Sequence, residues 1–274
     1  MEWHAMMRWL SSKLKEGDIS EAGREARHIL EWATERPFSQ WVVNGGVVDE
    51  KAAVKIEEAA DRRIAGEPWA YITGHREFYG LDLLTTPAAL IPRPETELLV
   101  EKVLQNVLLP RARVADIGCG TGAIALALRS KRPAWDIFGV DISGEALELA
   151  CRNSERLNLP VTWIIADLLI GVPGSLDAIV ANLPYISPGS DDISPELRFE
   201  PSVALFADQG GLALIARLIE RAPAWLTLGG GIFLECGWDQ GAAVMELLAT
   251  QGFKEITRLS DYAGHDRVIS GRRS

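Results

Sequence analysis

The chain has 274 residues, of which 47% are hydrophobic and 24% charged, a composition typical of a globular protein that buries a sizeable core. Its 28 Lys and Arg against 38 Asp and Glu give a net charge of -10, which weighs against a protein whose function is to bind a nucleic-acid backbone. The apolar runs are too short for a membrane span. The N-terminal segment contains charged residues among its apolar ones and does not resemble a signal peptide.

The cysteines predict neither disulfides nor a metal site. Cys119, Cys151 and Cys236 are odd in number and lack Cys-x-x-Cys spacing, so we expect no disulfide framework and no zinc. Free thiols of this kind favour a reducing, cytoplasmic location. Nothing else in the sequence gives a reason to expect a metal.

Residues 1–74 predict a small helical domain. Ala26, Ile29, Leu30 and Ala33 recur at the spacing of one helix face, and residues 51–65 repeat this pattern after a turn at Asn44-Gly45-Gly46. No strand alternation and no catalytic motif is found here. The pattern alone leaves open whether this domain stabilises the rest of the chain or recognises a partner.

Residues 75–94 differ in character, because short apolar pieces alternate with glycine and proline. This composition predicts an extended linker, with a hairpin as one form of it. Helical spacing resumes at Glu95. We therefore expect a second domain over residues 95–274.

The second domain alternates predicted strands and helices, which is the pattern of a parallel, doubly wound α/β sheet. The strands are expected at 114–117, 135–140, 161–166, 178–181, 231–235 and 253–259. The helices between them are expected at 123–128, 145–157, 212–222 and 240–250.

A glycine-rich loop follows the first of these strands. It reads Asp116-Ile117-Gly118-Cys119-Gly120-Thr121-Gly122, and its glycines allow the backbone to turn sharply and approach a ligand. Its third glycine comes one position earlier than in dinucleotide-binding loops. A carboxylate at Asp116 is unfavourable beside a pyrophosphate but suits a ligand with an ammonium and a sulfonium. The loop therefore favours S-adenosylmethionine over a nicotinamide cofactor, with Cys119 as a small filler.

Carboxylates also end the next two strands. Asp141 is placed to accept the hydroxyls of a ribose, and Asp167 with Leu168 is placed to form an adenine pocket. Either aspartate alone is equally consistent with a helix cap or a solvated loop. Three carboxylates at successive strand ends beside a glycine-rich loop favour a nucleotide site.

The fourth strand runs into Asn182-Leu183-Pro184-Tyr185, a candidate catalytic clamp beside the cofactor's methyl group. An amide or aromatic-amine nitrogen is a poor nucleophile, because its lone pair is delocalised. The Asn182 side-chain oxygen and a backbone carbonyl near Leu183 and Pro184 can accept the two NH2 hydrogens and aim that lone pair. Pro184 fixes the turn, and Tyr185 offers a flat face for stacking. An ordinary turn after a strand is the alternative.

With these motifs the chain resembles the PrmC (HemK) family of protein-glutamine N5-methyltransferases. The most specific match is Ile91-Pro-Arg-Pro-Glu-Thr-Glu97, and residues 68–80, 200–206 and 263–271 also match. The resemblance implies a Rossmann-like class I methyltransferase domain with a seven-stranded sheet, preceded by a small all-α domain that binds peptide chain release factors. The implied substrate is the glutamine of the Gly-Gly-Gln motif, with no membrane and no direct nucleic-acid partner.

The resemblance also carries roles onto matching residues. Gly118 to Gly122, Asp141 and Leu168 are expected at the cofactor, and Asn182 is expected to contact both cofactor and glutamine. Arg93 and Glu95 are expected to shape the mouth of the site. The family's usual clamp is Asn-Pro-Pro-Tyr, whereas Leu183 makes this one like the clamp of ribosomal RNA adenine dimethylases. Adenine N6-methylation therefore stays an alternative, as do a catalytically silent binding protein and, more remotely, a nicotinamide dehydrogenase.

Overall fold

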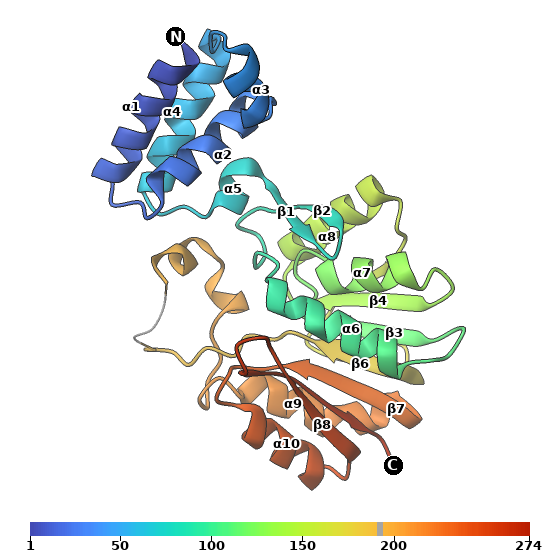
Figure 1. The fold of residues 1–274 in the computed structure, drawn as a ribbon. Coiled ribbons are helices and arrows are strands. Elements are labelled where there is room, and N and C mark those ends of the chain that lie inside the picture. The colour runs from blue at the N-terminus through green and yellow to red at the C-terminus, as the bar shows by residue number, and fades with distance from the viewer. Residues whose placement is uncertain (191–193) are drawn as a thin grey trace. The chain divides into compact units, whose positions relative to one another are not determined.

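A computed structural model describes residues 1–190 and 194–274 of the chain. The chain divides into two compact units, residues 1–74 and residues 75–274 (Figure 1). None of the helices in the described residues has the length and apolar character that crossing a membrane requires.

The first unit consists of helices only. They are α1 (Trp3–Glu16), α2 (Ala22–Thr34), α3 (Phe38–Asn44), α4 (Glu50–Ile64) and α5 (Trp69–Thr73). The predicted face of α2 is buried at all four positions, and the predicted repeat at 51–65 corresponds to α4. Asp49 caps α4 by accepting the Ala52 N–H at 2.8 Å, which satisfies one of the free donors at the helix start.

The second unit begins with a hairpin, which occupies part of the segment predicted as a linker. Its strands β1 (His75–Phe78) and β2 (Leu81–Leu84) pair antiparallel. The fully buried Asn153 accepts the Leu84 N–H at 2.7 Å and donates to the carbonyls of Leu84 at 3.1 Å and Thr121 at 3.0 Å. The hairpin is thereby attached to the glycine-rich loop.

Seven strands form the main sheet, as the family resemblance implied, in the order β5-β4-β3-β6-β7-β9-β8. They are β3 (Arg113–Ile117), β4 (Asp136–Asp141), β5 (Thr162–Ile165), β6 (Leu176–Ala181), β7 (Leu226–Glu235), β8 (Lys254–Ser260) and β9 (Asp266–Arg272). The expectation of a wholly parallel sheet is wrong at one edge. β9, for which we predicted no strand, lies antiparallel between β7 and β8, because the short connection after β8 allows a reversal.

Helices cover both faces of this sheet (Figure 1). Along β6, Ala178 and Val180 face one core, and Ile179 and Ala181 face the other. The first core is covered by α6 (Glu97–Asn106), α7 (Ala123–Lys131) and α8 (Gly144–Leu157). The second is covered by α9 (Ala213–Trp225) and α10 (Gly241–Thr250). Because β3 pairs with β4 on one side and β6 on the other, the strand order reverses there and opens a crevice at the carboxyl ends.

Candidate active site

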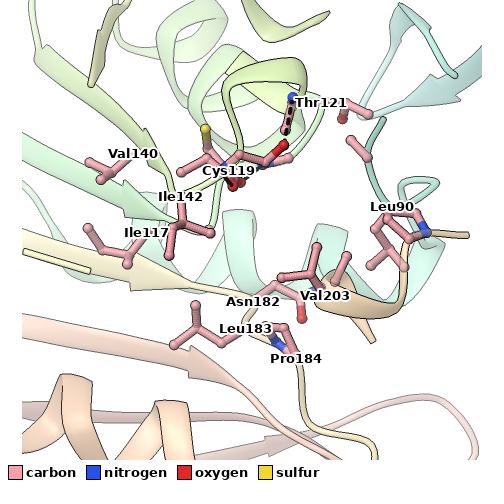
Figure 2. A pocket seen from close by; sticks show the side chains of 18 of the residues that line it. Leu90, Ile117, Cys119, Thr121, Val140, Ile142, Asn182, Leu183, Pro184 and Val203 are labelled. Carbon is pink, nitrogen blue, oxygen red and sulfur yellow. Dashed lines mark hydrogen bonds between the residues drawn. The ribbon is translucent and has the colours of Figure 1, made fainter. Parts of the chain in front are cut away.

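A cavity of about 270 Å³ lies at this crevice. In Figure 2, Cys119 and Thr121 lie on one side of it and Asn182 and Pro184 on the opposite side, while Leu90 and Val203 close a third. Its lining is mostly apolar, with a few polar groups that converge on it, which is typical of a small-molecule site. Of the predicted site residues, the lining includes Arg93, Gly118, Cys119, Gly120, Thr121, Asp141, Asp167, Leu168, Asn182, Leu183 and Pro184.

The glycine-rich loop has a backbone that requires its glycines. Gly118, Gly120 and Gly122 have φ angles of 73°, 54° and 82°, a region that side chains with a Cβ rarely adopt. A Cβ on Gly118 would also lie 2.9 Å from Leu183 Cδ2, and one on Gly122 would lie 2.8 Å from the Trp163 ring. The loop can therefore follow this path only with glycine at these positions.

Asp141, the last residue of β4, has both carboxylate oxygens at the loop. Oδ2 accepts the Gly120 N–H at 2.9 Å, and Oδ1 accepts the Ser143 N–H at 2.9 Å. Each oxygen can accept a further hydrogen bond, so the carboxylate holds the loop and still offers acceptors to ribose hydroxyls.

Asp167 and Leu168 line the cavity two residues beyond β5. Asp167 Oδ2 forms an ion pair with Arg217 of α9 at 2.5 Å. Leu168 has φ 56°, an unusual angle for a bulky residue, and its side chain is buried. The two residues predicted to form an adenine pocket thus present a carboxylate and an apolar side chain to the cavity.

Asp116, which we predicted to suit a ligand ammonium, is not among the residues that line the cavity. Its side chain is fully buried, and Oδ2 accepts the Ala125 N–H of α7 at 3.0 Å. Burial raises the pKa of this carboxyl from 3.8 to about 7. Burial also raises the pKa of the neighbouring Cys119 thiol, with Asp116 adding to the effect, so Cys119 is a thiol and not a nucleophilic thiolate.

The clamp begins directly after β6. Asn182 Nδ2 donates a hydrogen bond to Thr96 Oγ1 at 3.1 Å. Leu183 is 4% exposed and packs under Gly118, so this side chain serves packing below the loop. Pro184 lines the cavity.

Tyr185, predicted to offer a face for stacking, is not among the residues that line the cavity. Its hydroxyl lies 3.5 Å from Glu235 Oε1, and its carbonyl accepts a hydrogen bond from Gln240 Nε2 at 2.9 Å. Burial, followed by the nearby Glu235 charge, raises the pKa of Tyr185. In this conformation the residue anchors the chain that follows the clamp.

One wall of the cavity is held by Glu200, whose side chain is 1% exposed. Its carboxylate accepts the Ile91 N–H at 3.0 Å and pairs with the Arg93 guanidinium. Arg93 lines the cavity, whereas Glu95 is exposed and is not among the lining residues.

Three polar residues at the site were not singled out from the sequence: Thr96, Glu200 and Glu235. Glu235 could have been found from the sequence, because it is a carboxylate that ends a predicted strand. It ends β7 at the sheet edge where Asn182 follows β6. Thr96 and Glu200 lie inside the two segments that carry the family resemblance. Their individual roles depend on contacts that no local pattern encodes.

Comparisons with known proteins agree with this geometry. The family model for the methyltransferase small domain matches residues 94–236, and that for the PrmC N-terminal domain matches residues 5–74. The release factor glutamine methyltransferase of Salmonella typhimurium is 37% identical over 96% of this chain and 97% of its own length. That of Neisseria gonorrhoeae is 42% identical over 90% and 92%. The chain belongs to the release factor glutamine methyltransferase family.

The family assignment confirms the resemblance and the predicted fold class of this methyltransferase. The crystal structure of a methyltransferase from Pyrococcus furiosus superposes with a TM-score of 0.54 at 19% identity, covering 81% of this chain and 97% of that one. At this identity the likeness concerns the fold alone. The glycine-rich loop and the clamp of this chain therefore lie within a class I methyltransferase fold.

Proposed function

We propose that this protein transfers a methyl group from S-adenosylmethionine to the side-chain amide nitrogen of the glutamine in the Gly-Gly-Gln motif of peptide chain release factors. The observation that carries the proposal is the Asn182 side chain, which lines the cavity opposite the glycine-rich loop. The names of the relatives supply the substrate class.

The cavity suits the proposed cofactor. A mostly apolar lining, three left-handed glycines and the acceptors of Asp141 fit a nucleoside with a hydrophobic base and ribose hydroxyls. Gly118 to Gly122 with Asp141, Asp167 and Leu168 would hold it, and Asp116 would act indirectly by holding the start of α7. When bound, S-adenosylmethionine supplies an electrophilic methyl group on a sulfonium.

The residues of the clamp orient the acceptor nitrogen. Asn182 Oδ1 and a carbonyl near Leu183 and Pro184 accept the two amide hydrogens, which directs the nitrogen lone pair at the methyl group. The new N–C bond forms as the S–C bond breaks. The methylated nitrogen is acidic and releases its extra proton to water, so the residues around it need not include a strong base.

A protein substrate is favoured over a nucleic acid. The net charge of -10 disfavours contacts to phosphates. Leu183, which makes the clamp similar to that of adenine dimethylases, is buried under Gly118. We also propose that residues 1–74 recognise the release factor and that the enzyme works in the cytoplasm, where free cysteines such as Cys119 and Cys236 persist.

The test is transfer of tritium from labelled S-adenosylmethionine to a purified release factor. We expect label on the wild-type factor and none on a factor whose Gly-Gly-Gln glutamine is replaced by alanine. Asn182→Ala should lower the rate at least about a hundredfold, because the nitrogen is no longer oriented. Label that survives the glutamine replacement, or that goes instead to adenine in RNA, overturns the proposal.

A further inference from the structure

Three polar side chains from separate elements meet behind the clamp. Asn182 directly follows β6 and Glu235 ends the adjacent parallel strand β7, where Ala181 pairs with Leu234. Thr96, the last residue of the 3₁₀ helix η1 (Pro94–Thr96), accepts a hydrogen bond from Asn182 Nδ2 at 3.1 Å. The Thr96 hydroxyl in turn lies beside the Glu235 carboxyl group and lowers its pKa as a hydrogen-bond donor. Thr96 is 4% exposed and Glu235 is 1% exposed, so the chain of contacts is shielded from water.

We propose that Thr96 and Glu235 are positioning residues, which fix the side-chain amide of Asn182 with its nitrogen toward Thr96 and its oxygen toward the acceptor glutamine. The inference rests on the proposed function, because it assigns a use to the Asn182 oxygen in that reaction. It adds two residues that act through Asn182: Thr96, at the edge of the cavity lining, and Glu235, which lies outside the lining.

The direction follows from counting donors. An ionised carboxylate can only accept hydrogen bonds, so the single proton of the Thr96 hydroxyl is donated to Glu235. The Thr96 oxygen is then left only as an acceptor, and the group of Asn182 that can donate to it is the NH2. Oδ1 of Asn182 must therefore face away from Thr96. Without the carboxylate, the Thr96 hydroxyl could donate its hydrogen bond to Asn182 Oδ1, and the side-chain amide of Asn182 could rotate by half a turn.

Charged and titratable groups surround Glu235 on several elements. Its pKa is raised from 4.5 to about 7, chiefly by burial and to a smaller extent by the negative charge of Glu95 of η1. Hydrogen bonding from Thr96, the positive charge of Arg267 on β9 and the hydroxyl of Tyr185 lower it. The neighbouring Cys236 thiol has a pKa raised by burial to about 12 and stays uncharged. Glu235 Oε2 is buried and has no hydrogen-bond partner within the described residues, whereas Oε1 lies 3.5 Å from the Tyr185 hydroxyl.

This arrangement has a pH signature with two opposite parts. Once Glu235 is protonated, the Thr96 hydroxyl no longer has to donate its proton to it, and the orientation of Asn182 is no longer fixed. The rate constant for methyl transfer should therefore fall as the pH decreases through about 7. The same protonation removes a buried charge and should stabilise the fold at lower pH. A rate that falls while the protein becomes more stable cannot be caused by unfolding.

The experiment compares four variants of the full-length protein with a release factor as substrate. Glu235→Gln keeps the size of the side chain but can donate to Thr96, and Thr96→Val removes the hydroxyl. Thr96→Ser keeps the hydroxyl and is the conservative partner of Thr96→Val. Glu246→Gln, an exposed glutamate on α10, is the matched control. The measurements are kcat and KM for the release factor between pH 5.5 and 8.5, and the Kd of S-adenosylmethionine by titration.

We expect Glu235→Gln and Thr96→Val to lower kcat about tenfold or more, as a loss of orientation does, with the Kd of S-adenosylmethionine changed less than about threefold. Glu235→Gln should also lose the inflection near pH 7, and Thr96→Ser and Glu246→Gln should behave as wild type. A wild-type kcat and pH profile in Glu235→Gln overturns the inference, even if Thr96→Val fails to fold. A wild-type enzyme that does not label the release factor overturns the proposed function instead, so the two failures are distinguishable.

Discussion

Gly118 and Leu183 pack so closely that a Cβ on Gly118 would lie 2.9 Å from Leu183 Cδ2. This contact joins the two halves of the site, because Gly118 belongs to the cofactor loop and Leu183 to the clamp. It also gives Leu183 a packing role that does not depend on the chemical nature of the methyl acceptor.

We expect Gly118→Ala to weaken S-adenosylmethionine binding about tenfold or more. The φ of 73° costs a residue with a Cβ about 1–2 kcal/mol, and the contact with Leu183 adds to this. Isothermal titration measures the change. Gly174→Ala, where a Cβ would meet nothing within 4 Å, is the control. Equal affinities for Gly118→Ala and wild type would show that the loop tolerates a side chain here.

Asn153→Ala should destabilise the second unit by about 2–3 kcal/mol. The substitution removes three hydrogen bonds at a fully buried position and leaves the Leu84 N–H unsatisfied. Urea unfolding measures the free energy, and hydrogen exchange should become faster at the Leu84 amide. Asn44→Ala, at an exposed position at the end of α3, should change the free energy of unfolding much less. An unchanged exchange rate at Leu84 would contradict the role of Asn153.

Asp116→Asn should flatten the pH dependence of stability. The folded-state pKa of Asp116 is raised to about 7, so the folded protein binds this proton more tightly than the unfolded chain does. The cost of its charge is fully present above pH 7 and is lost as the pH falls toward 4. Between those limits wild type should gain stability from this group on acidification, by at most a few kcal/mol.

Urea unfolding at pH 8 and at pH 5.5 checks the prediction for Asp116. On going from pH 8 to pH 5.5, the free energy of unfolding should increase more, or decrease less, in wild type than in Asp116→Asn. Glu246→Gln should keep the wild-type difference. The same difference in all three proteins would mean that Asp116 does not take up a proton on folding.

Separating Arg93 from Glu200 should loosen the wall of the cavity. Glu200 joins Ile91 and Arg93 to the segment that carries Val203, and both segments line the site (Figure 2). Glu200→Ala should raise the Kd of S-adenosylmethionine or the KM for the release factor about tenfold, because the buried carboxylate holds two donors.

A double-mutant cycle with Arg93→Met and Glu200→Gln measures their coupling. We expect the double variant to lose less than the sum of the two single losses, since each single change leaves a partner without its hydrogen bonds. Strictly additive losses would mean that the ion pair does not hold the wall.

Much of the fold was predictable, because its signals are local. The apolar spacing of α2 and the alternation of strands with helices follow the periods of 3.6 and 2 that a segment shows by itself. β9 escaped prediction because its residues follow a short turn and its partners, β7 and β8, are chosen by the sheet edge. The direction of a strand depends on its neighbours, and no single segment contains that information.

The sequence by itself determined the family motifs: the glycine-rich loop, Asp141 and the clamp from Asn182. Their residue types are required by turns and by chemistry that a few adjacent positions specify. Only the tertiary structure decided that Asp116 is buried outside the cavity, that Tyr185 is directed at Glu235, and that Asn182 meets Thr96 across 86 residues of sequence. These relationships arise when packing brings distant strand ends together, and burial then decides which polar groups must bind one another.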